Sequence, residues 1–292
     1  MSDTGWTMKQ NATATAKGFI YQFYEAIDWC WKLEKGESLY IETFGDISIS
    51  NNVNIEVKNV KSDLTDMGES FWKTLGNWLD SGFPEGNFKT LILLTTQKIG
   101  ADSQFSNWNS CTLVDRQKIL TNIIESDKKS YDQKLDLYNQ KISQNPQRTS
   151  VKAPKLNKHV DKVRQQINSS KVSNIVSKFI IMDSSQMFSD RYESLCNIYG
   201  KAVLAKNVEM FINSQIGFIL SPKSTADKWE ITYDDFTNEI NHLTQTLSAG
   251  SRIFPRVNNK PINTAAYKYH LFVKKINDIK YSDVIKLGSG ST

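Results

Sequence analysis

Residues 39–61 read LYIETFGDISISNNVNIEVKNVK, a run that predicts the centre of a β-sheet. Apolar residues alternate with polar ones through much of it, as they do in β-strands that bury one face. We expect three strands here: 38–44, 46–50 and 53–60. Asn51 and Asn52 separate the last two strands, and because Asn tolerates positive φ they favour a tight turn. The pattern therefore predicts a β-hairpin.

Three side chains of this hairpin have the chemistry for hydrolysis. Residues two apart in a strand point to the same face, so Glu56 and Lys58 share a face while Val57 points into the core. Pairing of the two strands would bring Asp46 close to them. Two carboxylates suit Mg²⁺, or Mn²⁺ in its place, and a nearby ammonium can stabilise charge in a transition state. The alternative is a solvent-facing strand, where Glu and Lys pair weakly across the ladder.

The flanking sequence places the hairpin in an α/β core. Apolar residues at helical spacing predict helices over 12–34 and 69–79, before and after it. The apolar run 88–96 (FKTLILLTT) predicts a buried strand. The order helix, three strands, helix, strand indicates a central sheet with helices on it.

The rest of the chain predicts mainly helices. We expect a polar helix over 112–142, a loop over 143–157, a helix over 158–170 and a second buried strand at 178–183 (KFIIMD). We divide the chain into four parts: a core at 1–110, a helical insertion with a returning strand at 111–185, a mainly helical assembly region at 186–286, and a linker or tag remnant at 287–292 (LGSGST).

Composition limits the class of protein. Of the 292 residues, 39% are hydrophobic and 23% are charged, which is ordinary for a globular chain. The apolar runs are too short to cross a bilayer, and the first 18 residues carry no apolar signal segment. Three scattered cysteines form no metal-binding or disulfide pattern. We therefore expect a reduced, cytoplasmic protein without a structural zinc and without a membrane partner.

The positive charge is concentrated in the second part of the chain. Residues 1–110 hold 9 Lys and Arg against 14 Asp and Glu, whereas residues 111–292 hold 27 against 17. The segment 148–171 is the densest, with seven basic residues and one Asp. Such a segment can bind DNA phosphates, although a solvated loop and helix face would look the same. The candidate DNA-binding residues are Lys152, Lys155, Lys158, Lys162 and Arg164.

The first hundred residues resemble a family of bacterial anti-phage nucleases. The runs GFIYQFYEAI at 18–27, IETFGDI at 41–47 and IEVKN at 55–59 carry the resemblance. The similar domain is the PD-(D/E)xK effector nuclease of CBASS systems, which also occurs in Lamassu and ABC-three-component proteins. Its pattern matches Gly18, Tyr21, Gln22, Glu42, Asp46, Ile47, Glu56 and Lys58. Many relatives have Gln at the position of Glu56.

This resemblance implies a fold and an activity. It implies a restriction-endonuclease-like mixed sheet flanked by helices and cleavage of double-stranded DNA. Asp46 and Glu56 would bind the metal, Lys58 would be catalytic, and Gln22 would reach the site from the first helix. Glu42 would be a further ligand or a support.

The resemblance also implies regulation by partners. The region 231–257 loosely resembles Lamassu-type nucleases, which work with an SMC-like, Rad50-type ATPase and a small accessory subunit. We expect activation by homo-oligomerisation or by release from such partners. Two alternatives stay open: a DNA-binding scaffold without catalysis, and a restriction-type enzyme that reads a specific sequence.

Overall fold

The predicted hairpin lies at the centre of a six-stranded sheet in the computed structural model, which describes residues 12–144 and 152–248. The strands are β1 (Ser38–Ile41), β2 (Ile47–Ile49), β3 (Val53–Lys58), β4 (Thr90–Thr95), β5 (Phe179–Met182) and β6 (Glu230–Thr232). Their order across the sheet is β5-β4-β3-β2-β1-β6. The neighbours from β3 to β6 pair antiparallel, whereas β3, β4 and β5 pair parallel to one another. The expected α/β class with a mixed sheet is therefore confirmed.

Helices make up most of the remaining described chain. They are α1 (Ala12–Cys30), α2 (Glu69–Trp78), α3 (Leu113–Gln144), α4 (Lys158–Gln166), α5 (Ser170–Lys178), α6 (Phe188–Tyr199), α7 (Val208–Ile219), α8 (Pro222–Thr225) and α9 (Tyr233–Ser248). Short 3-10 turns are η1 (Glu85–Asn87), η2 (Gln104–Ser110), η3 (Gly200–Ala202) and η4 (Ala205–Asn207). The described part after β5 is mostly helical, as the sequence predicts.

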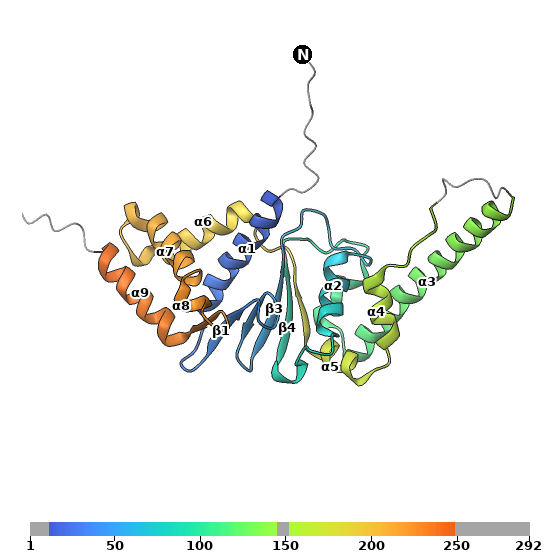
Figure 1. Ribbon diagram of the computed structural model, residues 1–292, viewed down its shortest axis with the longest axis horizontal. Helices are drawn as coiled ribbons and strands as arrows, with labels where there is room; N and C mark the ends of the chain where they lie inside the picture. Colours follow the sequence, from blue (N-terminus) through green and yellow to red (C-terminus); the bar gives the residue numbers. More distant parts are fainter. Residues whose placement is uncertain (1–11, 145–151, 249–292) are drawn as a thin grey trace, which may run out of the picture. The chain divides into compact units, whose positions relative to one another are not determined.

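Helices cover both faces of the sheet (Figure 1), and a hydrophobic core lies on each face. Ile55 and Val57 of β3 point into the first core, which they share with α1, α6, α7 and α9. Leu91, Leu93 and Phe179 point into the second core, which they share with α2, α3, α4 and α5. Because side chains alternate along a strand, Glu56 and Lys58 lie on the α2 face of the sheet. Hydrophobic burial thus fixes which face carries the polar residues of the hairpin.

Several details differ from the sequence prediction. The strand expected over 38–44 ends at Ile41, and the strand expected to be buried at 178–183 is the edge strand β5, in which Ile180 and Met182 are exposed. The helix expected over 158–170 ends at Gln166, and a separate helix, α5, begins after Ser169, whose hydroxyl accepts a hydrogen bond from Val172 N. The structure also adds β6, a three-residue edge strand that pairs with β1. Three residues are too few for an alternation pattern to be recognised, so the sequence predicts helix through this region.

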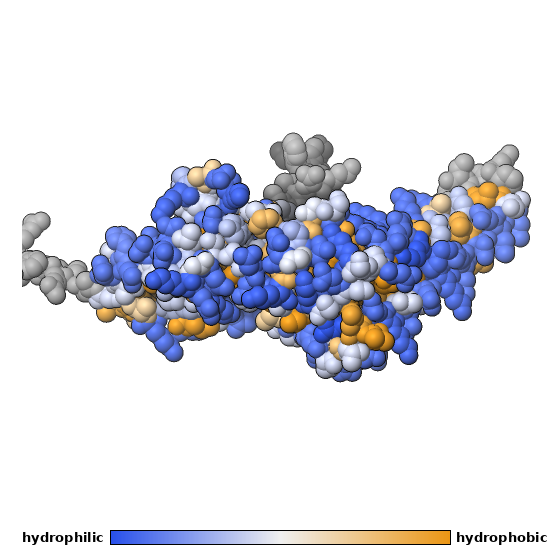
Figure 2. All heavy atoms as spheres, turned by 90° about the horizontal axis from the view of Figure 1, so that it is seen from below, coloured by the Kyte–Doolittle hydropathy of each residue, from blue (hydrophilic) through white to orange (hydrophobic). Residues whose placement is uncertain are grey.

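The surface carries both hydrophobic and hydrophilic residues. On the face drawn in Figure 2, hydrophobic atoms gather in small groups between hydrophilic ones, which is usual for folded proteins. Within the described ranges, no helix is long and apolar enough to cross a membrane. The predicted linker at 287–292 and the predicted helical region from 249 onward lie outside the described residues.

Candidate active site

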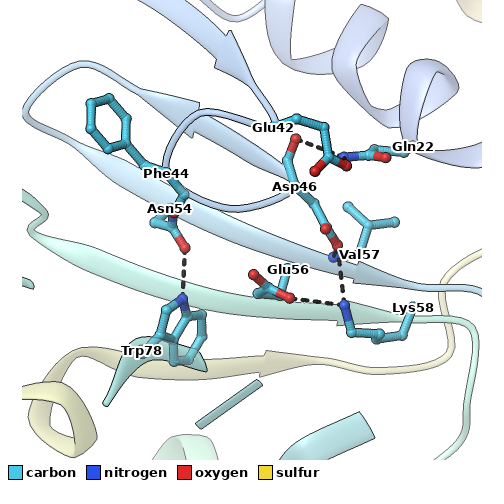
Figure 3. A network of polar contacts seen from close by, with 9 residues as sticks. All are labelled: Gln22, Glu42, Phe44, Asp46, Asn54, Glu56, Val57, Lys58 and Trp78. Atoms are coloured by element: carbon cyan, nitrogen blue, oxygen red, sulfur yellow. Dashed lines mark hydrogen bonds and ion pairs between the residues drawn. The ribbon is translucent and has the colours of Figure 1, made fainter. Parts of the chain in front are cut away.

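The hairpin brings Asp46, Glu56 and Lys58 together, as predicted. Ile47 pairs with Ile55 across the ladder, so Asp46 comes opposite Glu56 where β2 begins. The Lys58 ammonium lies between the two carboxylates, with Nζ 3.1 Å from Asp46 Oδ2 and 2.9 Å from Glu56 Oε2 (Figure 3). Asp46 Oδ2 also accepts a hydrogen bond of 2.7 Å from Val57 N, which fixes its side chain against β3.

Burial and the attraction between the side chains act in opposite directions on the pKa values of Glu56 and Lys58. Burial raises the pKa of Glu56, which is 4% exposed, and the attraction of the Lys58 ammonium does not cancel that effect. Burial lowers the pKa of Lys58, but the Glu56 and Asp46 carboxylates outweigh it and leave this pKa above its ordinary value. Lys58 is therefore a cation at neutral pH, held by two acids at the edge of the core.

Gln22 reaches the site from α1, as the resemblance implies. Its Nε2 donates to Glu42 Oε1 at 2.9 Å and to the backbone oxygen of Asp46 at 2.8 Å. Glu42 begins the loop between β1 and β2 with a φ of 52°, which is uncommon for a residue other than glycine. Gln22 thus holds both ends of this loop. The side chain of Glu42 turns to Gln22 in Figure 3, and its role as a metal ligand stays a prediction.

Asn54 is a structural support of the site that the sequence motifs do not single out. Its Nδ2 donates to the Phe44 carbonyl at 2.8 Å, and its Oδ1 accepts from Trp78 Nε1 at 2.7 Å. It therefore ties the loop before Asp46 to helix α2. The strand pattern does place Asn54 on the face of the site, because it is a polar residue two positions before Glu56. Its partners cannot be predicted from spacing.

Helix α2 supplies a second unpredicted contact. Asn77 lines the same hollow as Glu56, and its side chain opposes the effect of burial on the Glu56 pKa. The aromatic residues of α2, Phe71, Trp72 and Trp78, are buried. The helix thus packs its aromatic face on the sheet and turns one amide to the site.

Two hollows open on either side of the three charged residues. The first, of about 260 Å³, is lined by Glu56 together with Phe44, Gly45, Asn77 and Phe83, among others. The second, of about 510 Å³, is lined by Lys58 together with residues of the α2 N-terminus. Glu56 and Lys58 therefore each border a hollow, and a concave surface of this kind is where a catalytic site is sought.

The donor set fits a hard divalent cation. Asp46 and Glu56 supply oxygen atoms, and Mg²⁺ is commonly bound by one or two carboxylates while it keeps several waters. Within residues 12–144 and 152–248, no group of three or more His, Cys, Asp or Glu converges as a closed metal cage. Asp46 and Glu56 are thus the residues that would hold a metal here, with water completing its shell.

The predicted basic segment meets the core through α4, which packs on α2. Lys162 and Arg164 are engaged by acids: Lys162 Nζ lies 2.6 Å from Asp80, and Arg164 contacts Asp161. Lys152, Lys155 and Lys158 are exposed. The five candidates therefore divide into two ion-paired residues and three lysines that face solvent.

Comparisons with known proteins add nothing to this geometry. No protein-family model, no curated protein and no solved structure matches the chain.

Proposed function

We propose that this chain is a metal-dependent endonuclease that cuts double-stranded DNA. The observation that carries the proposal is the position of the Lys58 ammonium within 3.1 Å of both Asp46 and Glu56, in a concave region. The order of a helix, three antiparallel strands and a parallel fourth strand supports a restriction-endonuclease-like core.

The reaction would be hydrolysis of a phosphodiester. The oxygen of a water forms a bond to phosphorus, one ester P–O bond breaks, and the leaving oxygen gains a proton. Lys58 would donate hydrogen bonds to a phosphate oxygen and offset the negative charge that builds up on it. Gln22 would keep the loop before Asp46 in place. A bound Mg²⁺ or Mn²⁺ would acidify water and neutralise phosphate charge.

We further propose that the enzyme is the effector of an anti-phage or anti-plasmid complex. Resemblance of residues 18–59 to such nucleases supports this role. The expected partners are a Rad50-type ATPase and a small accessory subunit, and the active form would be a homo-oligomer in the cytoplasm. A DNase acting without such control would damage its own host.

The test is cleavage of linear and circular plasmid DNA with Mg²⁺, over a range of protein concentrations and with any ATPase encoded beside the gene. We expect cleavage that EDTA abolishes and that falls by at least about a hundredfold in Lys58→Ala, as when a donor to a developing oxyanion is removed. The matched control is Lys201→Ala, at an exposed lysine in η3. Cleavage that survives in Lys58→Ala would refute the proposed site.

The non-catalytic alternative has one observation in its favour, the exposed positions of Lys152, Lys155 and Lys158. A scaffold would bind DNA through them with a strong salt dependence and without need of a divalent metal. Salt-sensitive binding that Lys58→Ala leaves unchanged, with no cleavage under any of the conditions above, would favour this alternative.

A further inference from the structure

Phe44 presents an exposed aromatic ring from a loop whose backbone is held on both sides. The loop begins at Glu42, with a φ of 52°, and ends at Gly45, with a φ of 132°. Between them, the Phe44 carbonyl accepts the hydrogen bond from Asn54. The side chain is nevertheless 38% exposed. The ring is therefore displayed from a defined position, two residues before Asp46.

Neighbouring rings leave the flat faces of Phe44 without a parallel partner. Tyr40 and Phe88 lie 5.8 and 6.3 Å away by ring centroids, at interplanar angles of 77° and 64°. Among the described residues, no aromatic ring stacks parallel on Phe44. A planar group from another molecule could occupy that place, because offset stacking is one of the arrangements aromatic pairs prefer.

Phe44 also lines two hollows at once. It shares the hollow of about 260 Å³ with Glu56, and it shares another of about 220 Å³ with Tyr40, Phe88 and Lys228. Lys228 is exposed and brings a cation to the second hollow. An aromatic ring beside a cation is the combination with which proteins hold unpaired nucleotides, the ring for the base and the cation for the phosphate.

The ring of Phe44 points away from Asp46, Glu56 and Lys58 in Figure 3. It is therefore placed to contact a nucleotide beside the reacting phosphate, without touching the reacting atoms. We infer that Phe44 is a stacking platform for one unpaired nucleobase next to the cleaved bond, an inference that rests on the nuclease function proposed above. DNA with an unpaired base at that position, as in an overhang or a gap, is then the preferred substrate.

The test separates binding from cleavage. A DNA duplex with a single-stranded overhang carries 2-aminopurine at its first unpaired position, and its fluorescence is titrated with the full chain in EDTA. Phe44→Leu should weaken binding by roughly tenfold, the range expected for loss of one base stack, and should abolish the fluorescence change. Phe44→Trp should keep the affinity and the fluorescence change of the wild-type chain. Met210→Ala, which removes another exposed side chain, should change neither.

Each result distinguishes the base contact from the nuclease activity. Equal affinity and equal fluorescence change for wild type, Phe44→Leu and Phe44→Trp, with Lys58-dependent cleavage intact, would refute the base contact and leave the nuclease standing. A fluorescence change that requires an aromatic residue at 44, in a chain that cuts no DNA with Mg²⁺, would establish the base contact and refute the nuclease. Preservation of the fold in each variant is checked by circular dichroism.

Discussion

Gly45 lies in the loop after β1, close to the Glu56 carboxylate. Its φ is 132°, a conformation that side chains disfavour, and a Cβ at this position would lie 3.0 Å from Glu56 Oε1 and 3.1 Å from Asn54 Nδ2. We therefore expect Gly45→Ala to lower the free energy of unfolding by about 1–3 kcal/mol and to reduce cleavage, because Glu56 must move. Urea unfolding and the plasmid assay measure the two effects.

The control for Gly45 is Gly217, inside α7. A Cβ at Gly217 meets no atom within 4 Å, and its backbone is helical. Gly217→Ala should therefore raise the free energy of unfolding by about 0.5–1 kcal/mol. If Gly45→Ala left the free energy of unfolding unchanged, or raised it as Gly217→Ala should, the close approach of the loop to Glu56 would be wrong.

The residues of the site differ in how far the sequence can predict them. Glu56, Lys58 and Asp46 are predictable because two strands and a turn fix their relative positions locally. Gln22 comes from the resemblance alone, since it lies on a helix whose position on the sheet no spacing determines. Asn54 escapes prediction because its role comes from tertiary contacts, and those depend on how the loop and α2 meet.

Helix α3 divides into a packed part and an exposed part. Its buried side chains, among them Leu120 and Ile124, all lie in the first half, whereas Leu137 is 55% exposed. We expect Leu120→Ala to lower the free energy of unfolding by about 2–5 kcal/mol, because it removes buried apolar surface and leaves a cavity. Leu137→Ala should stay within about 0.5 kcal/mol of wild type. Equal effects of the two substitutions in denaturant titrations would contradict this division.

A buried ion-pair network ties α6 to α1, the helix that carries Gln22. Arg191 binds Glu25 with two hydrogen bonds of 2.8 and 2.9 Å, and Tyr199 donates to Asp28 at 2.6 Å. Burial would raise the pKa of Asp28, but hydrogen bonds from Lys32 and Tyr199 and the charge of Arg191 outweigh it and leave this pKa lowered. A carboxyl with a lowered folded-state pKa contributes stability above its unfolded-state pKa and loses it on acidification.

Removal of the Tyr199 hydroxyl should therefore lower the free energy of unfolding by an amount that depends on pH. At neutral pH, Tyr199→Phe should lower the free energy of unfolding by about 1.5–3 kcal/mol, as for a hydrogen bond to a charged group. This destabilisation should shrink as the pH falls below 3.8, the ordinary value for Asp28. Tyr192→Phe is the control, because Tyr192 donates to the amide of Asn213, which does not titrate. A destabilisation by Tyr199→Phe that is independent of pH would contradict the assignment.

Charge is unevenly divided over the whole molecule. The residues up to 110 carry a net −5 and hold the three charged residues of the site, whereas residues 111–292 carry a net +10. A nuclease needs both acidic and basic side chains, since the carboxylates that would hold a metal also repel the phosphates of DNA. Basic side chains elsewhere in the fold must then supply the attraction that brings DNA to the acids.

The exposed lysines of the basic segment should carry that attraction, and the ion-paired ones should contribute less. Lys155→Ala combined with Lys158→Ala should reduce the slope of log affinity for DNA against log salt by roughly two, one for each lysine that no longer neutralises a phosphate. Lys162→Ala should reduce it less, because Asp80 already neutralises the Lys162 ammonium. Titrations in EDTA with labelled duplex at several salt concentrations measure the slopes. An unchanged slope in the double variant would show that this segment does not bind DNA, whereas a reduction by a full unit for Lys162→Ala would show that DNA displaces Asp80.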